Sequence, residues 1–184
     1  MKQRICTLLA CVAVLWTFST HDISAQMVAL RTYPLRDLMM TPNIGVDFVV
    51  GERYTLGAEV VFNHTPWGIQ MQLANVTPEF RYWYNGRPFT RQYIGVVANM
   101  TGYNLAWNNV HHGDALGIGI SFGHVWTLTQ RWNIDFTCSV GVIGYREKFY
   151  YKNDYFTDYG ERANSHGYAL LPIKLGVSVV YVIR

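Results

Sequence analysis

Residues 132 to 142 read Trp132-Asn133-Ile134-Asp135-Phe136-Thr137-Cys138-Ser139-Val140-Gly141-Val142. Every even position holds an apolar side chain, and every odd position holds a polar or small one. Because side chains alternate between the two faces of a strand, this period of two predicts a β-strand with one apolar face. Its 11 residues match the roughly 9 to 11 that a tilted strand needs to cross the hydrocarbon layer of a membrane.

The same alternation recurs on both sides of this segment. In residues 115–126, apolar side chains alternate with Gly117, Gly119 and Ser121, and residues 54–63 follow the same rule with Val61 as the exception. Reading outward with this pattern predicts eight strands. They cover residues 27–35, 43–51, 54–63, 71–84, 92–106, 114–127, 131–145 and 168–183.

Short and long connections alternate between these strands. The short ones are residues 52–53, 85–91, where Asn85-Gly86 is a turn signal, and 128–130. The longer ones are residues 36–42, 64–70, 107–113 and 146–167. Outer-membrane barrels have an even number of strands, short periplasmic turns and longer external loops. We therefore predict an all-β fold, an eight-stranded antiparallel up-and-down transmembrane β-barrel with both termini of the barrel in the periplasm.

The face opposite the apolar one carries four acidic and three basic residues, which are Arg31, Asp47, Glu59, Glu79, Arg81, Asp135 and Lys174. The rest of this face is rich in Gly and Ser. The face therefore has too few polar side chains to form the water-exposed outer wall of a soluble, lipocalin-like barrel. Inside a narrow barrel the charges can pair with one another, and the glycines leave room for longer side chains. Side chains fill the lumen of an eight-stranded barrel. We therefore expect a plugged lumen and no general diffusion pore.

Six aromatic residues of the apolar face fall near the predicted periplasmic ends of their strands. They are Tyr54, Tyr82, Tyr84, Trp126, Trp132 and Tyr181. Tyr and Trp concentrate where a membrane meets water. A general preference of aromatic residues for strands would explain their number but not their common level. We expect these six residues to form an interfacial aromatic girdle.

Composition agrees with a membrane barrel. Charged residues make up 15% of the chain and aromatic residues another 15%, whereas soluble domains carry roughly 25% charged residues. The formal net charge of +3 is too small to suggest a nucleic-acid partner.

Residues 1–25 read as a secretory signal peptide, because Lys2 and Arg4 precede a short apolar run and Ala25 offers a small residue for cleavage. Residues 26–184 then form a single barrel domain. A lipoprotein cleavage site at Cys11 is the alternative, but it would leave almost no apolar residues ahead of it. After cleavage at residue 25, Cys138 is the remaining cysteine, so no internal disulfide is expected.

Two features of the strands have further implications. Pro78 lies inside the fourth predicted strand, and a closed barrel has no edge strand where a missing N–H is harmless, so we predict a β-bulge there. Residues 174–181 follow the polar, any, Gly, any, any, apolar, any, aromatic pattern of barrel-assembly signals. This motif predicts that the barrel-assembly machinery is a partner during biogenesis.

The chain resembles a family of small barrels from Bacteroidota, Gram-negative bacteria, that is classed as a domain of unknown function. In architecture that family is similar to OmpA-like and OmpX-like barrels. The resemblance covers nearly all of the predicted mature chain, and its motifs are residues 28–32 with 41–45, 78–83, 117–123 with Trp126, and 131–133. Members often occur in fimbrial gene neighbourhoods, which implies a supporting role at the cell surface but no particular activity.

Enzymes that modify lipid A offer a second hypothesis, because some eight-stranded outer-membrane barrels use serine, histidine and an acid for that purpose. Here Ser121 and His124 are three positions apart and so face opposite sides of one strand. His64, His111, His112 and His166 fall in predicted external loops, where Ser165 and His166 are merely adjacent. No second cluster accompanies His111 and His112 at metal-ligand spacing. We expect no catalytic residues, no metal site and no cofactor.

The last external loop is unusually aromatic for a solvated connection. Tyrosine-rich loops suit recognition because they offer a large amphipathic contact area at low entropic cost. A hairpin that extends the barrel wall, with its rings packed together, explains the same composition. The recognition candidates are Phe149, Tyr150, Tyr151, Tyr155, Phe156 and Tyr159.

The leading hypothesis is therefore a non-enzymatic protein of the cell outer membrane, structural or active in surface interactions. Its expected partners are outer-membrane lipid and a surface or fimbrial protein. A lipid-modifying enzyme is the second hypothesis. A lumen that binds or transports a small solute is the third, and it requires a cavity among the lumen side chains.

Overall fold

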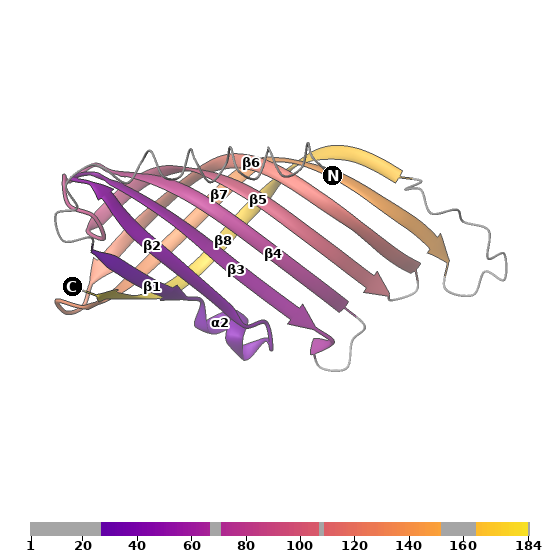
Figure 1. Cartoon of the computed structure of the whole chain (residues 1–184), viewed down its shortest axis with the longest axis horizontal. Helices are drawn as coiled ribbons and strands as arrows, with labels where there is room; N and C mark the ends of the chain where they lie inside the picture. The colour runs from indigo at the N-terminus through magenta and orange to yellow at the C-terminus, as the bar shows by residue number, and fades with distance from the viewer. Residues whose placement is uncertain (1–26, 67–70, 107–108, 152–164, 184) are drawn as a thin grey trace, which may run out of the picture.

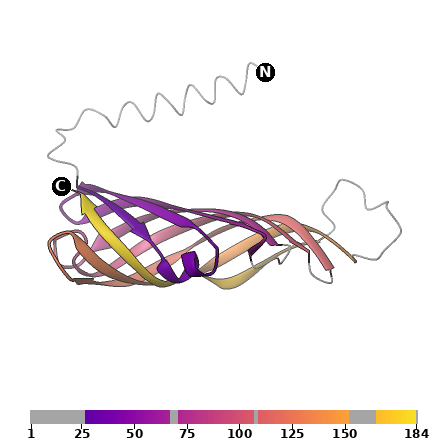
Figure 2. The ribbon, with the colours of Figure 1, turned by 90° about the horizontal axis from the view of Figure 1, so that it is seen from below.

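A computed structural model describes residues 27–66, 71–106, 109–151 and 165–183. Its strands are β1 (Val28–Thr32), β2 (Asn43–Gly51), β3 (Tyr54–His64), β4 (Met71–Trp83), β5 (Arg91–Ala106), β6 (Asn109–Thr127), β7 (Trp132–Tyr151) and β8 (Ser165–Ile183). Each pairs antiparallel with its sequence neighbours, and β1 pairs with β8 to close the barrel (Figures 1 and 2). The predicted all-β, eight-stranded antiparallel up-and-down barrel is confirmed. The predicted signal peptide, residues 1–25, lies outside the described residues.

The two ends of the barrel differ. At one end, which we call the turn end, lie the connections 52–53, 84–90 and 128–131 and the closing pair Val28 with Ile183. At the opposite end, the loop end, β1, β3, β5 and β7 end and β2, β4, β6 and β8 begin. Within the described ranges no helix is long and apolar enough to span a membrane.

The wall is much higher on one side of the barrel than on the other. β1 has 5 residues and β2 has 9, whereas β6 has 19 and β7 has 20. At the loop end β5 to β8 therefore extend far beyond β1 and β2 (Figure 1). This extension corrects two predicted loops, because residues 109–113 belong to β6 and residues 146–151 to β7. In this extension the outward residues, such as Asp114 and Arg146, are polar. The alternation of apolar residues in the sequence therefore ends, although the backbone pairing of β6 with β7 continues.

The first connection, predicted as residues 36–42, contains a short helix. β1 ends at Thr32, and α2 (Pro34–Leu38) follows with proline in its first turn, where a missing N–H is tolerated. Asn43 holds the connection together, since it donates to Asp37 (2.9 Å) and accepts from the Tyr33 backbone N–H (2.8 Å). This arrangement places α2 over the lumen beside β8, which it contacts.

The prediction of a β-bulge at Pro78 is wrong. Val76 pairs with Met100 and Glu79 pairs with Val97 in one unbroken register, so no extra residue is inserted. The side chain of Pro78 simply takes its turn on the outer face between the inward Thr77 and Glu79. Pro78 has no partner residue on β5, but on β3 it pairs with Ala58.

The bulge lies instead beside Pro172 on β8. Ser139 pairs with Lys174, but Val140 pairs with Pro172, which leaves Ile173 without a partner residue on β7. The extra residue turns both Ile173 and Lys174 toward the lumen. Room for Ile173 exists because Gly119 and Gly141 on the neighbouring strands have no side chain.

We predict that Gly141→Ala destabilises the barrel by about 1 to 3 kcal/mol, the usual cost of overpacking. A methyl group there would lie 2.6 Å from both Ile173 Cδ1 and Gly119 Cα. At Gly144 on the same strand, the nearest atom to an added Cβ is 3.8 Å away, so Gly144→Ala is the matched control with little effect. Urea midpoints of the detergent-folded proteins measure the difference. Equal midpoints for the two variants would contradict this account of the bulge.

Candidate functional site

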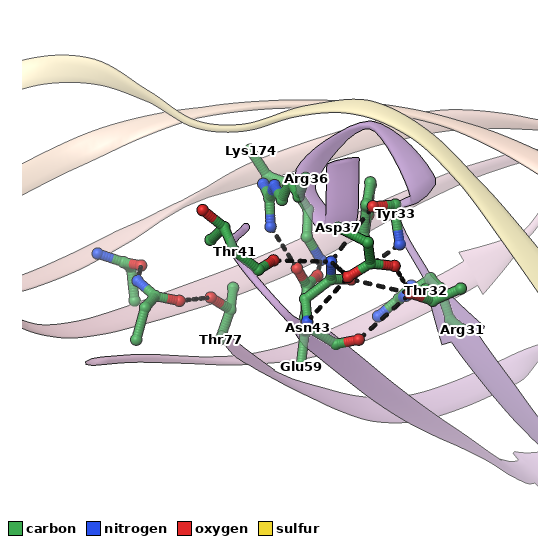
Figure 3. Close-up of polar contacts among 12 residues, drawn as sticks. Arg31, Thr32, Tyr33, Arg36, Asp37, Thr41, Asn43, Glu59, Thr77 and Lys174 are labelled. Carbon is green, nitrogen blue, oxygen red and sulfur yellow. Dashed lines mark hydrogen bonds and ion pairs between the residues drawn. The ribbon is translucent and has the colours of Figure 1, made fainter. Parts of the chain in front are cut away.

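The structure brings all seven residues of the predicted lumen cluster together. Arg31, Asp47 and Glu59 come from β1, β2 and β3, Glu79 and Arg81 from β4, Asp135 from β7, and Lys174 from β8. Strand alternation turns each side chain inward, and each residue is buried. Figure 3 shows Arg31, Glu59 and Lys174 pointing into this space from three strands.

The Glu79 carboxylate lies at the centre of the charges. Its Oε2 atom is 2.8 Å from Arg81 Nη2 and 3.2 Å from Lys174 Nζ. Arg31 is farther away, with 3.9 Å between Nη1 and the same oxygen. Three cations therefore share one carboxylate.

The other carboxylates each pair with one or two of the same cations. Asp135 Oδ2 lies 3.2 Å from Arg81 Nη1 and 3.9 Å from Arg31 Nη1, and Asp47 Oδ1 lies 3.4 Å from Arg31 Nη2. Glu59 Oε2 lies 2.7 Å from Lys174 Nζ. These contacts join residues of six strands into one ionic network.

Sequence reasoning missed a fourth cation, Arg36. It belongs to α2 and reaches into the lumen, where its guanidinium donates to Glu59 Oε1 at 2.5 Å (Figure 3). With Arg36 the cluster contains four cations for four carboxylates. Nothing in the local pattern marked this residue, because its position depends on how the connection folds back over the lumen.

Two buried tyrosines pack against the cations. The Tyr33 ring lies 4.6 Å below Arg36 Cζ and 5.7 Å from Lys174 Nζ, and the Tyr93 ring lies 4.4 Å from Arg81 Cζ. Such contacts attract a cation to the face of an aromatic ring. The Tyr93 hydroxyl also donates to Asp135 Oδ1 at 3.1 Å. Gly123 leaves the space that the Tyr93 ring occupies.

An apolar cluster closes the lumen at the turn end. Trp83, Tyr93 and Phe89 pack on one another, with ring centroids 4.9 Å apart for Trp83–Tyr93 and 5.7 Å for Trp83–Phe89. Phe89 lies in the connection before β5 and has a positive φ of 59°. It folds back into the barrel, although its connection was predicted to be a simple turn. The charged layer is therefore sealed from the turn end.

On the loop side of the charges, amides and hydroxyls line the wall, and a cavity remains. Asn75 donates to Thr101 Oγ1 at 2.6 Å, and Thr77 donates to Asn75 Oδ1 at 2.6 Å. The cavity lies beneath α2 and has a volume of about 260 Å³. Its lining includes Arg36, Met39, Asn63, Met71, Ile173 and Lys174. A lumen that binds a small solute requires a cavity among the lumen side chains, and this cavity meets that requirement.

The histidines and serines considered for catalysis lie on different faces. Ser121 is buried in the lumen, while His124 on the same strand points outward and packs against Trp126. Ser165 and His166 also take opposite faces of β8. Among the described residues, no group of three or more His, Cys, Asp and Glu side chains is placed to hold a metal ion.

His111 contacts a carboxylate within the raised wall. Its Nδ1 atom lies 3.2 Å from Glu147 Oε2, and the Tyr103 hydroxyl donates to the same oxygen at 3.0 Å. Burial, together with this hydrogen bond, raises the pKa of Tyr103 to about 12. Tyr103 therefore remains a neutral donor at physiological pH.

All six residues of the predicted girdle face outward at the turn end. Ring centroids are 5.4 Å apart for Tyr54–Tyr82, 5.6 Å for Tyr82–Tyr84 and 4.8 Å for Trp132–Tyr181. Trp126 packs on Phe136 at 5.2 Å. Five of the six residues thus form two groups of contacting rings, Tyr54–Tyr82–Tyr84 and Trp132–Tyr181, while Trp126 packs on Phe136 outside both groups.

The aromatic residues proposed for recognition are placed only in part. The backbones of Phe149, Tyr150 and Tyr151 belong to β7, which supports the extended-hairpin alternative for this part of the loop. Tyr155, Phe156 and Tyr159 lie outside the described residues.

Comparison with known proteins identifies a family but no activity. The model of the family "Protein of unknown function (DUF3575)" matches residues 9–183. Neither a curated protein nor a solved structure matches the chain.

We predict that Glu79→Gln lowers the free energy of unfolding by about 3 to 5 kcal/mol, because it leaves buried cations without their shared partner. Asp47→Asn is the matched control, since Arg31 is the one ion-pair partner of Asp47 among the described residues, and should cost clearly less. Urea unfolding of both variants in detergent tests the order. A larger effect of Asp47→Asn would show that Glu79 is not the centre of the network.

Proposed function

The chain belongs to the DUF3575 family of proteins of unknown function, and from its barrel we propose a non-enzymatic role in the outer membrane. The barrel crosses that membrane with its turn end in the periplasm and its loop end outside the cell. The high wall formed by β5 to β8 is the surface that meets other components of the envelope. Its role is structural or in surface interactions.

A belt of exposed apolar side chains around the barrel carries this proposal. On β6 the outward residues from Leu116 to Trp126 are apolar except His124, and on β7 the outward residues from Trp132 to Val142 are all apolar. Leu116 and Ile118 expose 62% and 63% of their surface. A belt of this height matches the roughly 9 to 11 residues of a membrane-spanning strand, and soluble monomers rarely expose so large a patch.

The distribution of charge supports the same placement. In water-soluble proteins most Asp and Glu residues are exposed, and the residues most often buried are apolar. Here four carboxylates are buried in the lumen, while leucine, isoleucine and phenylalanine cover the outside. This is the inverse of a soluble barrel and the arrangement expected where lipid surrounds the wall.

The filled lumen favours a structural or interaction role over transport. The ionic network and the cluster around Trp83 occupy the barrel from its middle to the turn end. The cavity of about 260 Å³ beneath α2 is smaller than the roughly 300 to 1,000 Å³ of typical ligand sites. A small solute that entered it would find no open path through the barrel.

Cys138 offers a direct test of the membrane placement. It is exposed in the middle of the belt on β7, and in a chain without residues 1–25 it is the only cysteine. We predict that a nitroxide on Cys138, in lipid vesicles, collides with oxygen but is shielded from a water-soluble nickel complex.

The control for this experiment is Arg146→Cys in a Cys138→Ser background. Position 146 lies on the same strand and the same face, above the belt. Its label should be accessible to the nickel complex. Ready access of the complex to position 138 would refute the membrane placement.

The non-enzymatic part of the proposal has its own test. Deletion of the gene should leave the acylation and phosphorylation pattern of lipid A unchanged by mass spectrometry, because Ser121 and His124 occupy opposite faces of β6. A changed pattern that wild type restores, and that Ser121→Ala does not, would establish the lipid-modifying alternative.

A further inference from the structure

The outer face of β5 to β8 has a hollow where the apolar belt ends. Two adjacent rows of outward residues line it, one on each side of the boundary. The row nearer the belt is Met100, Leu116, Gly144 and Tyr168. The next row toward the loop end is Gly102, Asp114, Arg146 and His166. The hollow has a volume of about 1050 Å³.

Missing side chains create this hollow. Gly102 and Gly144 form part of its floor. The atom nearest to a Cβ added at Gly144 would be the Leu116 carbonyl oxygen, 3.8 Å away. Tyr168 stands at its edge with 85% of its surface exposed. The floor is therefore low and open, with an amphipathic ring beside it.

Two cations and one carboxylate lie on the loop-end side of the hollow. Arg146 lies between Asp114 and His166 in the register of β6, β7 and β8. One row farther out, Lys148 lies beside His112. In the part of the chain that the structure describes, Arg146 and Lys148 form no ion pair, whereas every cation of the lumen network has one.

We propose that this hollow binds a phosphorylated lipid headgroup in the leaflet that meets the loop end. The proposal rests on the membrane placement argued above. Its acyl chains would lie on the belt over Met100 and Leu116, and its phosphate would reach the row of Arg146. A guanidinium binds phosphate through two parallel hydrogen bonds, and Lys148 and the neighbouring imidazoles add donors.

The position of the hollow favours a lipid over a free anion or an acidic protein. The site begins on side chains that the belt places against acyl chains and ends on charged side chains one row away. The row of Tyr168 marks the level at which aromatic residues with a polar tip concentrate in membranes. A soluble phosphate would use only the charged half of this surface.

The test measures binding of diphosphorylated lipid A to the detergent-solubilised protein by native mass spectrometry. We expect Arg146→Gln with Lys148→Gln to weaken binding on the order of 25-fold, from about fivefold for each hydrogen bond to the phosphate that is lost. Arg53→Gln with Arg131→Gln removes the same charge at the turn end and should leave binding unchanged. Dephosphorylated lipid A should bind no better to wild type than to the double variant.

Each remaining outcome overturns a defined part of the account. Equal loss in both double variants would mean that net charge, and not the hollow, governs binding. Competition by inorganic phosphate at the concentration of the lipid would assign the site to a free anion. If the label on Cys138 reports lipid in vesicles while the Arg146 and Lys148 variant binds lipid A normally, the headgroup site fails and the membrane placement stands. If the label reports water, the membrane placement itself fails.

Discussion

The pairing of charges inside the lumen is the constraint on which the rest of the structure depends. Four carboxylates and four cations occupy the lumen, and Glu79 alone contacts three of those cations. Removing one partner of a buried ion pair is strongly destabilising because the remaining charge is then buried without a partner or water. The strands must therefore keep the register that brings these side chains together. A shift by one residue would turn every charged side chain outward and every apolar one inward.

Much of this arrangement could be predicted from the sequence because strand alternation is a local property. The period of two between Trp132 and Val142 fixes which side chains share a face, and the charges identify the inner face. All seven predicted lumen residues accordingly lie together. The glycines of that face, such as Gly123 beside Tyr93, fit the expectation that small residues make room for large ones.

The features that sequence reasoning missed depend on contacts between distant parts of the chain. Arg36 and Phe89 lie in connections, and they enter the lumen only because those connections fold back into a closed barrel. The extension of β6 and β7 was missed because their outward residues become polar above the belt, which ends the apolar pattern but not the ladder. Proline alone does not locate a bulge either, since Pro78 keeps the register while the extra residue follows Pro172.

The central claim is that the apolar face of every strand meets lipid while the ionic face is enclosed. The most direct measurement is labelling of the vesicle-inserted protein by a carbene precursor confined to the lipid phase, with the modified residues located by peptide mass spectrometry. The account predicts labels on belt residues such as Ile118 and Phe136 and none on Glu79, Asp135 or Lys174. Labels on those charged residues, or a folded protein that remains monomeric in water without detergent, would contradict it.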